Sequence, residues 1–318
     1  MEVVRGLQNI SKADRGCVLT VGNYDGVHLG HQQMIRVVKQ RAAELAAPAT
    51  VLVFEPSSKE FIDPDGAPPR LTRWREKFAA LAALEVDRLV TLHFNEQIRA
   101  MSPELFVDRL IVSGLGARHV VVGHDFRYGS NACGTIETLK AAGRARGFGV
   151  EEIEPFVVDG VRVSSTAVRE RLERADYAGA ARLLGRPYRM VGHVAHGTEL
   201  GRTLGFPTAN VHLRRRKSPT WGISAVRVYG IEPKPLHGVA SLGTRPTVNG
   251  TEPLLEAHLF DFDGDLYGRL IEVEFIAKLR DEVKFESLDA MVKQMNQDAA
   301  QARELLSKVD SGRLQAHD

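Results

Sequence analysis

The sequence is poor in cysteine and has no long uninterrupted apolar run. Its two cysteines, Cys17 and Cys133, exclude a disulfide framework and are typical of the reducing cytoplasm. No segment approaches the ~18 uninterrupted apolar residues of a membrane span, and residues 1–5 lack the apolar core of a signal peptide. These absences predict a soluble cytoplasmic protein.

The sequence also lacks an excess of charge of one sign, because 42 Lys and Arg residues face 40 Asp and Glu residues, for a net charge of +2. This balance gives no electrostatic reason to expect nucleic acid or a membrane surface as a partner. The basic run at 214–217 is short and is interpreted as a solvated loop, with phosphate binding as the alternative. No Gly-x-x-x-x-Gly-Lys-Ser/Thr motif is present, which argues against a P-loop nucleotidase.

The 318 residues are enough for about two domains, and the chain has two halves with different patterns. From residue 17 to about 185, apolar runs alternate with helical patterns, which predicts an open parallel sheet in an α/β domain. The expected strands are 18–21, 50–54, 88–92 and 119–122, and the expected helices are 32–46, 73–84, 103–110 and 136–146.

After residue 185, strand-like segments separated by Gly- and Pro-rich turns predict a small antiparallel barrel or sandwich. The expected strands are 190–195, 224–228, 238–242, 254–260 and 270–276. A helix at 288–306, with Leu288 at the start of its buried side, closes the chain. We therefore expect domains at 1–185 and 186–318.

The segment 21–31 carries two histidines between an expected strand and an expected helix. Gly22, Gly26 and Gly30 allow the backbone to approach a ligand, and a helix N-terminus attracts phosphate. His28 and His31 there would stabilise charge on a nucleotide phosphate. The alternatives are helix capping or half of a metal site, but a zinc site needs three or four ligands and no other Cys or His is near in sequence. We favour nucleotide chemistry.

Two further segments of the first half have residues suited to a phosphate. Asp125 follows the expected strand 119–122, and the run 162–166 places Arg162 and three hydroxyl residues before a helical pattern. Each alone is also explained as a turn or a helix cap. Because ligands of open parallel sheets bind at the carboxyl ends of the strands, we expect these segments to lie on one rim with the histidines.

In the second half, the segment 192–210 combines glycines with hard oxygen ligands. Gly197, Gly201 and Gly205 suit a loop folded over phosphates, and Thr208 and Asn210 offer two hard oxygens two residues apart on one face of a strand, which suits Mg²⁺. The alternative is a tight turn followed by a strand start. Farther on, Glu256 is a candidate general base or an exposed ion-pairing residue, and the acidic stretch 261–268 is interpreted as a turn.

These segments carry a family resemblance that covers essentially the whole chain. The segments 21–31 and 162–166 resemble the nucleotidylyltransferase module of the bacterial bifunctional riboflavin kinase/FMN adenylyltransferase (FAD synthetase) family, with Tyr24 where Phe is usual. Gly-Phe-Pro-Thr-Ala-Asn at 205–210 matches the riboflavin kinase signature. The resemblance implies an adenylyltransferase domain followed by an antiparallel β-barrel kinase domain with a C-terminal helix.

The resemblance also implies roles for individual residues. In the first domain, His28 and His31 would stabilise the α-phosphate of ATP. The other ATP-binding positions there would be Gly22, Asp25, Gly30, Asp125, Arg162, Ser165 and Thr166, and the candidate flavin contacts would be Phe54, Phe61 and Tyr128. In the second domain, Glu256 would deprotonate riboflavin, and Arg280 would contact the flavin. Thr208 and Asn210 would hold Mg²⁺, and Gly197, Gly201 and Gly205 would bind phosphate.

The implied function is phosphorylation of riboflavin by ATP to FMN, followed by adenylylation of FMN to FAD. The expected partners are riboflavin, FMN, FAD and ATP, with Mg²⁺ as the metal. One rival is a different adenylyltransferase fused to an unrelated barrel, against which the 205–210 signature and Glu256 argue. Another is a flavin carrier without turnover, against which the intact motifs argue.

Overall fold

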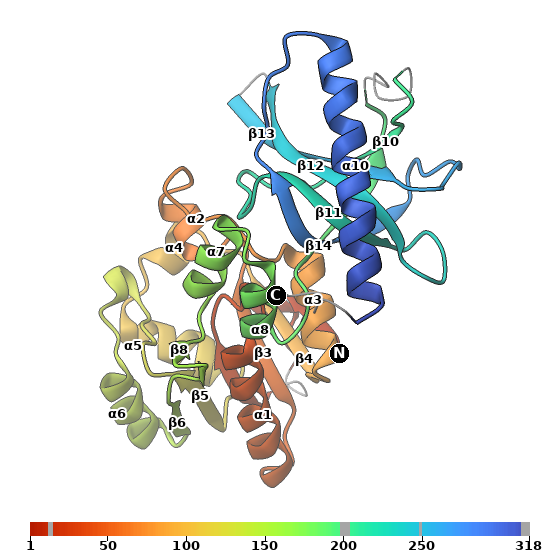
Figure 1. The fold of residues 1–318 in the computed structure, drawn as a ribbon. Helices are drawn as coiled ribbons and strands as arrows, with labels where there is room; N and C mark the ends of the chain where they lie inside the picture. The colour runs from red at the N-terminus through yellow and green to blue at the C-terminus, as the bar shows by residue number, and fades with distance from the viewer. Residues whose placement is uncertain (12–14, 198–203, 248–249, 313–318) are drawn as a thin grey trace. The chain divides into compact units, whose positions relative to one another are not determined.

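The computed structural model describes residues 1–11, 15–197, 204–247 and 250–312, which form two compact units (Figure 1). Unit 1 consists of Met1–Pro68 and Trp74–Val163, and unit 2 consists of Pro69–Arg73 and Ser164–Asp318. Each unit has its own buried apolar clusters. The predicted boundary at 185/186 divides the chain by activity, whereas these units divide it by packing. That boundary stays a prediction.

Unit 1 is built on a six-stranded sheet in which all neighbouring strands are parallel. All residues of its central strands β2 and β3 are buried, as expected for a parallel sheet covered on both faces. In spatial order the strands are β1 (Glu2–Arg5), β4 (Arg88–Leu92), β3 (Ala49–Phe54), β2 (Val18–Val21), β5 (His119–Gly123) and β6 (Gly149–Ile153). The predicted open parallel sheet is confirmed.

Several helices of unit 1 begin at side chains that accept a hydrogen bond from the first turn, such as Ser102 and Thr135. They are α1 (Leu29–Glu44), α2 (Ser58–Ile62), α3 (Trp74–Ala83), α4 (Glu96–Arg99), α5 (Pro103–Phe106) and α6 (Ile136–Arg146). Short 3₁₀ turns occur at η1 (Leu7–Asn9) and η4 (Ser130–Ala132), and β7 (Val157–Val158) pairs with β8 (Val161–Arg162). The α-helix predicted at 103–110 is shorter in the structure. It ends at Phe106, and the chain continues as a π-helix, η3 (Val107–Gly114).

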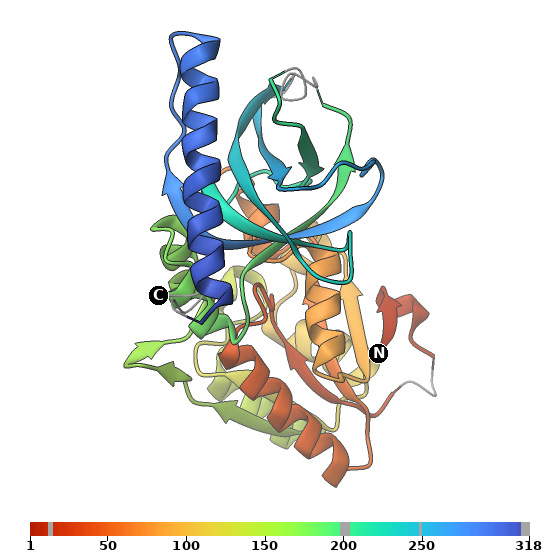
Figure 2. The ribbon, with the colours of Figure 1, turned by 45° about the vertical axis from the view of Figure 1, so that its right-hand side comes forward.

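Unit 2 contains a closed antiparallel barrel of six strands, which confirms the predicted barrel (Figure 2). Buried and less buried residues alternate along β9 and β10, as the strand period of two requires. The strands, in order around the barrel, are β10 (Thr208–His212), β13 (Gly250–Leu259), β12 (Leu236–Thr247), β11 (Gly222–Tyr229), β14 (Leu270–Arg280) and β9 (Arg189–Ala195).

The C-terminal helix α10 (Leu288–Asp310) packs along β11, β12 and β14 of the barrel (Figure 2). Its buried residues are Asp298, Ala302 and Leu306. The prediction that Leu288 marks the buried side is wrong, since its side chain is 57% exposed. The buried face is marked instead by Ala302 and Leu306, which belong to an apolar cluster, and by Asp298, which binds the guanidinium of Arg280 at the end of β14 at 2.7 Å.

Two helices before the barrel, α7 (Ser165–Glu173) and α8 (Tyr177–Leu184), belong to unit 2. The buried Tyr177 joins α8 to the barrel: its ring lies 5.5 Å from that of Phe275, and its hydroxyl lies 3.1 Å from Ser224 Oγ. Packing therefore assigns these helices to the barrel unit, although their pattern in the sequence continues that of the first half.

The segment Pro69–Arg73 is the other part of unit 2 that sequence patterns did not indicate. Arg215 holds it, since its guanidinium donates to the carbonyl oxygens of Arg70 and Leu71. Arg215 is only 6% exposed, so the interpretation of the basic run as a solvated loop is wrong at this position. The guanidinium satisfies backbone carbonyls inside the protein, which a pattern of charges along the chain does not show.

Two candidate active sites

The two histidines of the first segment are stacked at the start of α1. Their ring centroids lie 3.7 Å apart at an interplanar angle of 16°. His28 is the N-cap residue, and its Nδ1 accepts a hydrogen bond from the backbone N–H of His31 at 3.3 Å. Because Nδ1 accepts, the neutral ring carries its hydrogen on Nε2, where it can be donated to a phosphate oxygen. Capping and phosphate binding are therefore compatible roles of His28.

The backbone around these rings is tightly folded between β2 and α1. Tyr24 and Val27 have φ values of 48° and 44°, and Gly26 has 85°. Positive φ strains Tyr24 and Val27 but not Gly26, and such strained residues are common at functional sites. Tyr24 is buried, its hydroxyl lies 2.7 Å from Thr20 Oγ1, and its ring lies 4.7 Å from that of His31.

The glycines of this segment leave room for the neighbouring rings. A Cβ on Gly30 would lie 3.3 Å from His28 Nδ1, and a Cβ on Gly22 would lie 3.2 Å from the ring of Tyr24. Asp25 lies in the same turn and is partly buried. All five predicted positions of this segment are thus brought together around one turn, while their contact with ATP stays a prediction.

Two of the other predicted phosphate residues are joined directly to each other. Arg162 Nη2 donates to Asp125 Oδ2 at 2.7 Å, between the end of the β7–β8 hairpin and the loop after β5. Both side chains are more than half exposed. Ser165 and Thr166 open α7 in unit 2, where Ser164 is the N-cap, so their place in a site with His28 stays a prediction.

The three predicted flavin contacts of unit 1 fall into one aromatic cluster. Phe54 and Phe61 both pack against Phe94, with ring centroids 5.5 and 5.4 Å away. Tyr128 lies 5.3 Å from Phe106, and burial raises the pKa of its hydroxyl. Phe54 and Tyr128 are buried in the core. The cluster has a structural role whether or not it also contacts a flavin, and the flavin contact stays a prediction.

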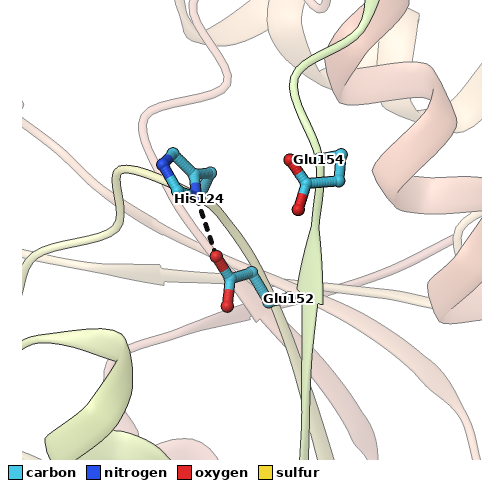
Figure 3. Close-up of side chains that lie close together, drawn as sticks. All are labelled: His124, Glu152 and Glu154. Atoms are coloured by element: carbon cyan, nitrogen blue, oxygen red, sulfur yellow. Dashed lines mark hydrogen bonds and ion pairs between the residues drawn. The ribbon is translucent and has the colours of Figure 1, made fainter.

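A group of possible metal-binding side chains lies next to Asp125. Within the described residues, His124, Glu152 and Glu154 are the one such group whose ligand atoms lie within 4.8 Å of one another (Figure 3). Glu152 already has two partners, Lys140 Nζ at 2.7 Å and His124 Nδ1 at 2.8 Å. These hydrogen bonds hold the pKa of Glu152 below its usual value. We therefore interpret the group as an ion-pair network.

In unit 2, the barrel places the three predicted kinase residues side by side. β10 pairs with β13 so that Asn210 lies opposite Glu256 and Thr208 lies opposite His258. Paired residues share a face of an antiparallel sheet, and so do residues two apart on one strand. Thr208, Asn210 and Glu256 therefore lie on one face.

Two of these residues, Thr208 and Asn210, border a cavity of about 560 Å³. They line it together with Gly197. A Cβ on Gly197 would lie only 2.2 Å from Asn210 Nδ2, so a larger residue there would displace the Asn210 amide. Gly205 has a φ of 80°, which favours glycine. Gly201 lies outside the described residues.

The cavity also reveals residues that sequence reasoning missed. The acidic stretch interpreted as a turn is indeed a loop, but residues Phe262–Tyr267 line the cavity together with strand residues. They include Asp263 and Asp265. His196 stacks on Tyr267 with ring centroids 3.7 Å apart. The signal available in the sequence was the density of carboxylates, which is equally typical of a solvated turn.

Glu256 has the electrostatic surroundings of a base. Burial raises the pKa of Glu256, and the nearby negative charge of Glu282 raises it further. A carboxylate with a raised pKa binds a proton more strongly and is therefore a better general base. Arg280, by contrast, directs its guanidinium to Asp298 and to the carbonyl oxygen of Asp281, so it ties α10 to the barrel. Its contact with a flavin stays a prediction.

Comparison with known proteins settles the family. Residues 10–167 match the family model described as FAD synthetase, and residues 184–306 match the model described as riboflavin kinase. The bifunctional riboflavin kinase/FMN adenylyltransferase of Pseudomonas fluorescens is 48% identical over 96% of this chain and 98% of its own. This chain belongs to that family. The enzyme of the same description from Escherichia coli K12 is 45% identical over 96% of this chain and 97% of its own.

A solved structure is similar over nearly its whole length. It is titled a macrolide-efflux protein from Streptococcus pneumoniae, and it matches with a TM-score of 0.80 and 29% identity over 95% of this chain and 99% of that chain. The curated relatives are more similar in sequence and carry the family description.

As a member of the riboflavin kinase/FMN adenylyltransferase family, the chain is a transferase of flavin-cofactor biosynthesis with a kinase and an adenylyltransferase activity. ATP-dependent enzymes of these two kinds generally need a divalent metal. Among the described residues, no helix is long and apolar enough to span a membrane.

Proposed function

We propose that residues 186–318 phosphorylate riboflavin with ATP to give FMN and ADP, and that residues 1–185 adenylylate FMN with a second ATP to give FAD and pyrophosphate. The partners are these flavins and ATP, with no nucleic acid and no membrane. The observation that supports the proposal best is the placement of Thr208, Asn210 and Glu256 on one barrel face, where Thr208 and Asn210 line the cavity. The free cysteines Cys17 and Cys133 support a cytoplasmic location.

In the kinase reaction, Glu256 accepts the proton of the riboflavin hydroxyl as its oxygen attacks the γ-phosphorus and the bond to ADP breaks. Thr208 and Asn210 present hard oxygens beside a cavity large enough for phosphates, which fits Mg²⁺, an ion that prefers few protein ligands, waters and substrate phosphates. Bound there, Mg²⁺ would neutralise charge on the phosphates. Gly197 leaves room for the Asn210 amide, and Gly197 and Gly205 would bind the phosphates.

In the adenylylation, a phosphate oxygen of FMN attacks the α-phosphorus of ATP and pyrophosphate leaves. His28 would donate a hydrogen bond from Nε2, and the ring of His31 stacks against that of His28. Both imidazoles would stabilise the negative charge that develops on the α-phosphate. Arg162 exchanges its exposed partner Asp125 for a phosphate, and Ser165 and Thr166 would add hydroxyl donors. Neither reaction needs a covalent enzyme intermediate.

A chromatographic assay of riboflavin, ATP and Mg²⁺ with the purified protein tests both steps. The wild-type chain should convert riboflavin to FMN and then to FAD. Asn210→Ala and Glu256→Gln should abolish FMN formation while supplied FMN still becomes FAD. Equal loss of both activities in these variants would contradict two separate sites.

A further inference from the structure

The loop that follows β14 is fastened to the barrel strand next to the proposed base. Ser241 Oγ donates to Glu282 Oε1 at 2.9 Å. Ser241 lies on β12 directly opposite Glu256 on β13. Asn210 lies opposite Glu256 on the other side, on β10. Glu256 is therefore flanked by Asn210 on one side and by Ser241, which holds Glu282, on the other.

A glycine makes room for this contact. Gly243 lies two residues after Ser241 on β12 and so on the same face. A Cβ at Gly243 would lie 2.2 Å from one carboxylate oxygen of Glu282 and 2.4 Å from the other. The carboxylate thus lies directly against the backbone at Gly243, and any side chain at 243 would displace it.

The two neighbours of Glu256, Asn210 and Ser241, differ in their relation to the cavity. Thr208 and Asn210 line the cavity that we assign to the phosphates of ATP, whereas Ser241 and Glu282 are not among its lining residues. Phosphoryl transfer places the attacking and leaving oxygens roughly in line on opposite sides of the phosphorus. With the donor on the Asn210 side, the alcohol that gives its proton to Glu256 approaches on the Ser241 side, where the loop is fastened.

We propose that Glu282 is a positioning residue for the acceptor alcohol: its hydrogen bond from Ser241 holds the loop 281–287 against the acceptor side of the kinase site. This proposal rests on the proposed role of Glu256. The loop is anchored at both ends, by the Arg280–Asp298 pair before it and by Ser287, the N-cap of α10, after it. Fastening Glu282 between these anchors fixes the loop before the substrate arrives.

The test is the kinase KM for riboflavin at saturating ATP and Mg²⁺ in the full-length chain. Glu282→Ala should raise this KM about three- to tenfold, as for loss of one hydrogen bond, with little change in the KM for ATP. Glu282→Gln should restore it, because the amide oxygen still accepts from Ser241. Ser241→Ala should match Glu282→Ala, and Gly243→Ala should do the same by displacing an unchanged Glu282.

The double variant Ser241→Ala with Glu282→Ala supplies the decisive comparison. Its KM should equal that of either single variant, since one hydrogen bond is lost in all three. Glu286→Ala, an exposed carboxylate of the same loop, is the matched control and should leave KM unchanged. An unchanged riboflavin KM in Glu282→Ala, or additive effects in the double variant, would overturn the proposal. If Glu256→Gln kept wild-type kinase activity, the assignment of the base would fail instead.

Discussion

Arg162 and Asp125 form an ion pair of 2.7 Å that joins the β7–β8 hairpin to the loop after β5. The guanidinium of a residue that we assign to phosphate binding is thus already held by a carboxylate on the same rim. Because both side chains are more than half exposed, water screens the pair and it contributes little to stability. If Arg162 binds phosphate as proposed, the pair would hold its guanidinium on this rim until the phosphate replaces Asp125.

Arg162→Ala should therefore lower kcat/KM of FMN adenylylation by about 10- to 100-fold, the effect of one charged hydrogen bond. Asp125→Asn keeps the shape of the partner but removes its charge, and should change this value less. Neither variant should alter the unfolding free energy by more than about 1 kcal/mol. Steady-state kinetics and urea unfolding measure the two effects, and a large stability loss without a kinetic one would contradict the assignment.

His28→Ala should lower adenylylation by ~10²–10³-fold, as for removal of one preorganised charge stabiliser. The variant also loses the cap of α1, which costs about 0.5–2 kcal/mol of stability. His28→Asn is the matched variant, because Asn is a good N-cap residue without an imidazole. His28→Asn should have the stability of the wild-type chain but the low adenylylation rate of His28→Ala. Recovery of adenylylation by Asn would show that His28 acts only as a cap.

Gly197→Ala should impair the kinase alone. The new Cβ would lie 2.2 Å from Asn210 Nδ2, so the amide must move, and a displacement of that order at a reacting centre costs about 10²-fold in rate. Formation of FMN from riboflavin should fall accordingly, while supplied FMN is still converted to FAD. Wild-type kinase rates in this variant would mean that the position of Asn210 does not matter to the reaction.

Glu256→Gln should abolish the kinase and stabilise the folded chain at neutral pH. The folded-state pKa of Glu256 is raised above its ordinary value of 4.5, so the folded chain binds this proton more tightly than the unfolded chain. Ionised Glu256 therefore lowers the unfolding free energy, fully above its raised pKa and not at all below the ordinary one. Thermal unfolding should show a gain for the Gln variant at pH 7 that disappears toward pH 4.

Local patterns were sufficient for much of the fold. The strands at 18–21 and 88–92 and the helix at 136–146 have the predicted bounds, because apolar runs and capping residues act over a few neighbouring residues. The histidine segment was recognised in the same way. The shift from helical to strand-like patterns near residue 185 correctly predicted a barrel. It did not show that α7 and α8 belong to the same unit as that barrel.

The sequence by itself determined the residue types of both sites, since their chemistry lies in short motifs. Only the tertiary structure decided which of these residues meet. Strand register places Glu256 between Asn210 and Ser241, and packing buries Asp298 against Arg280. Such contacts join residues far apart in the chain, and no local periodicity encodes them. The strand neighbours follow from closure of the barrel. The ion pair follows because a charge buried away from water must be paired.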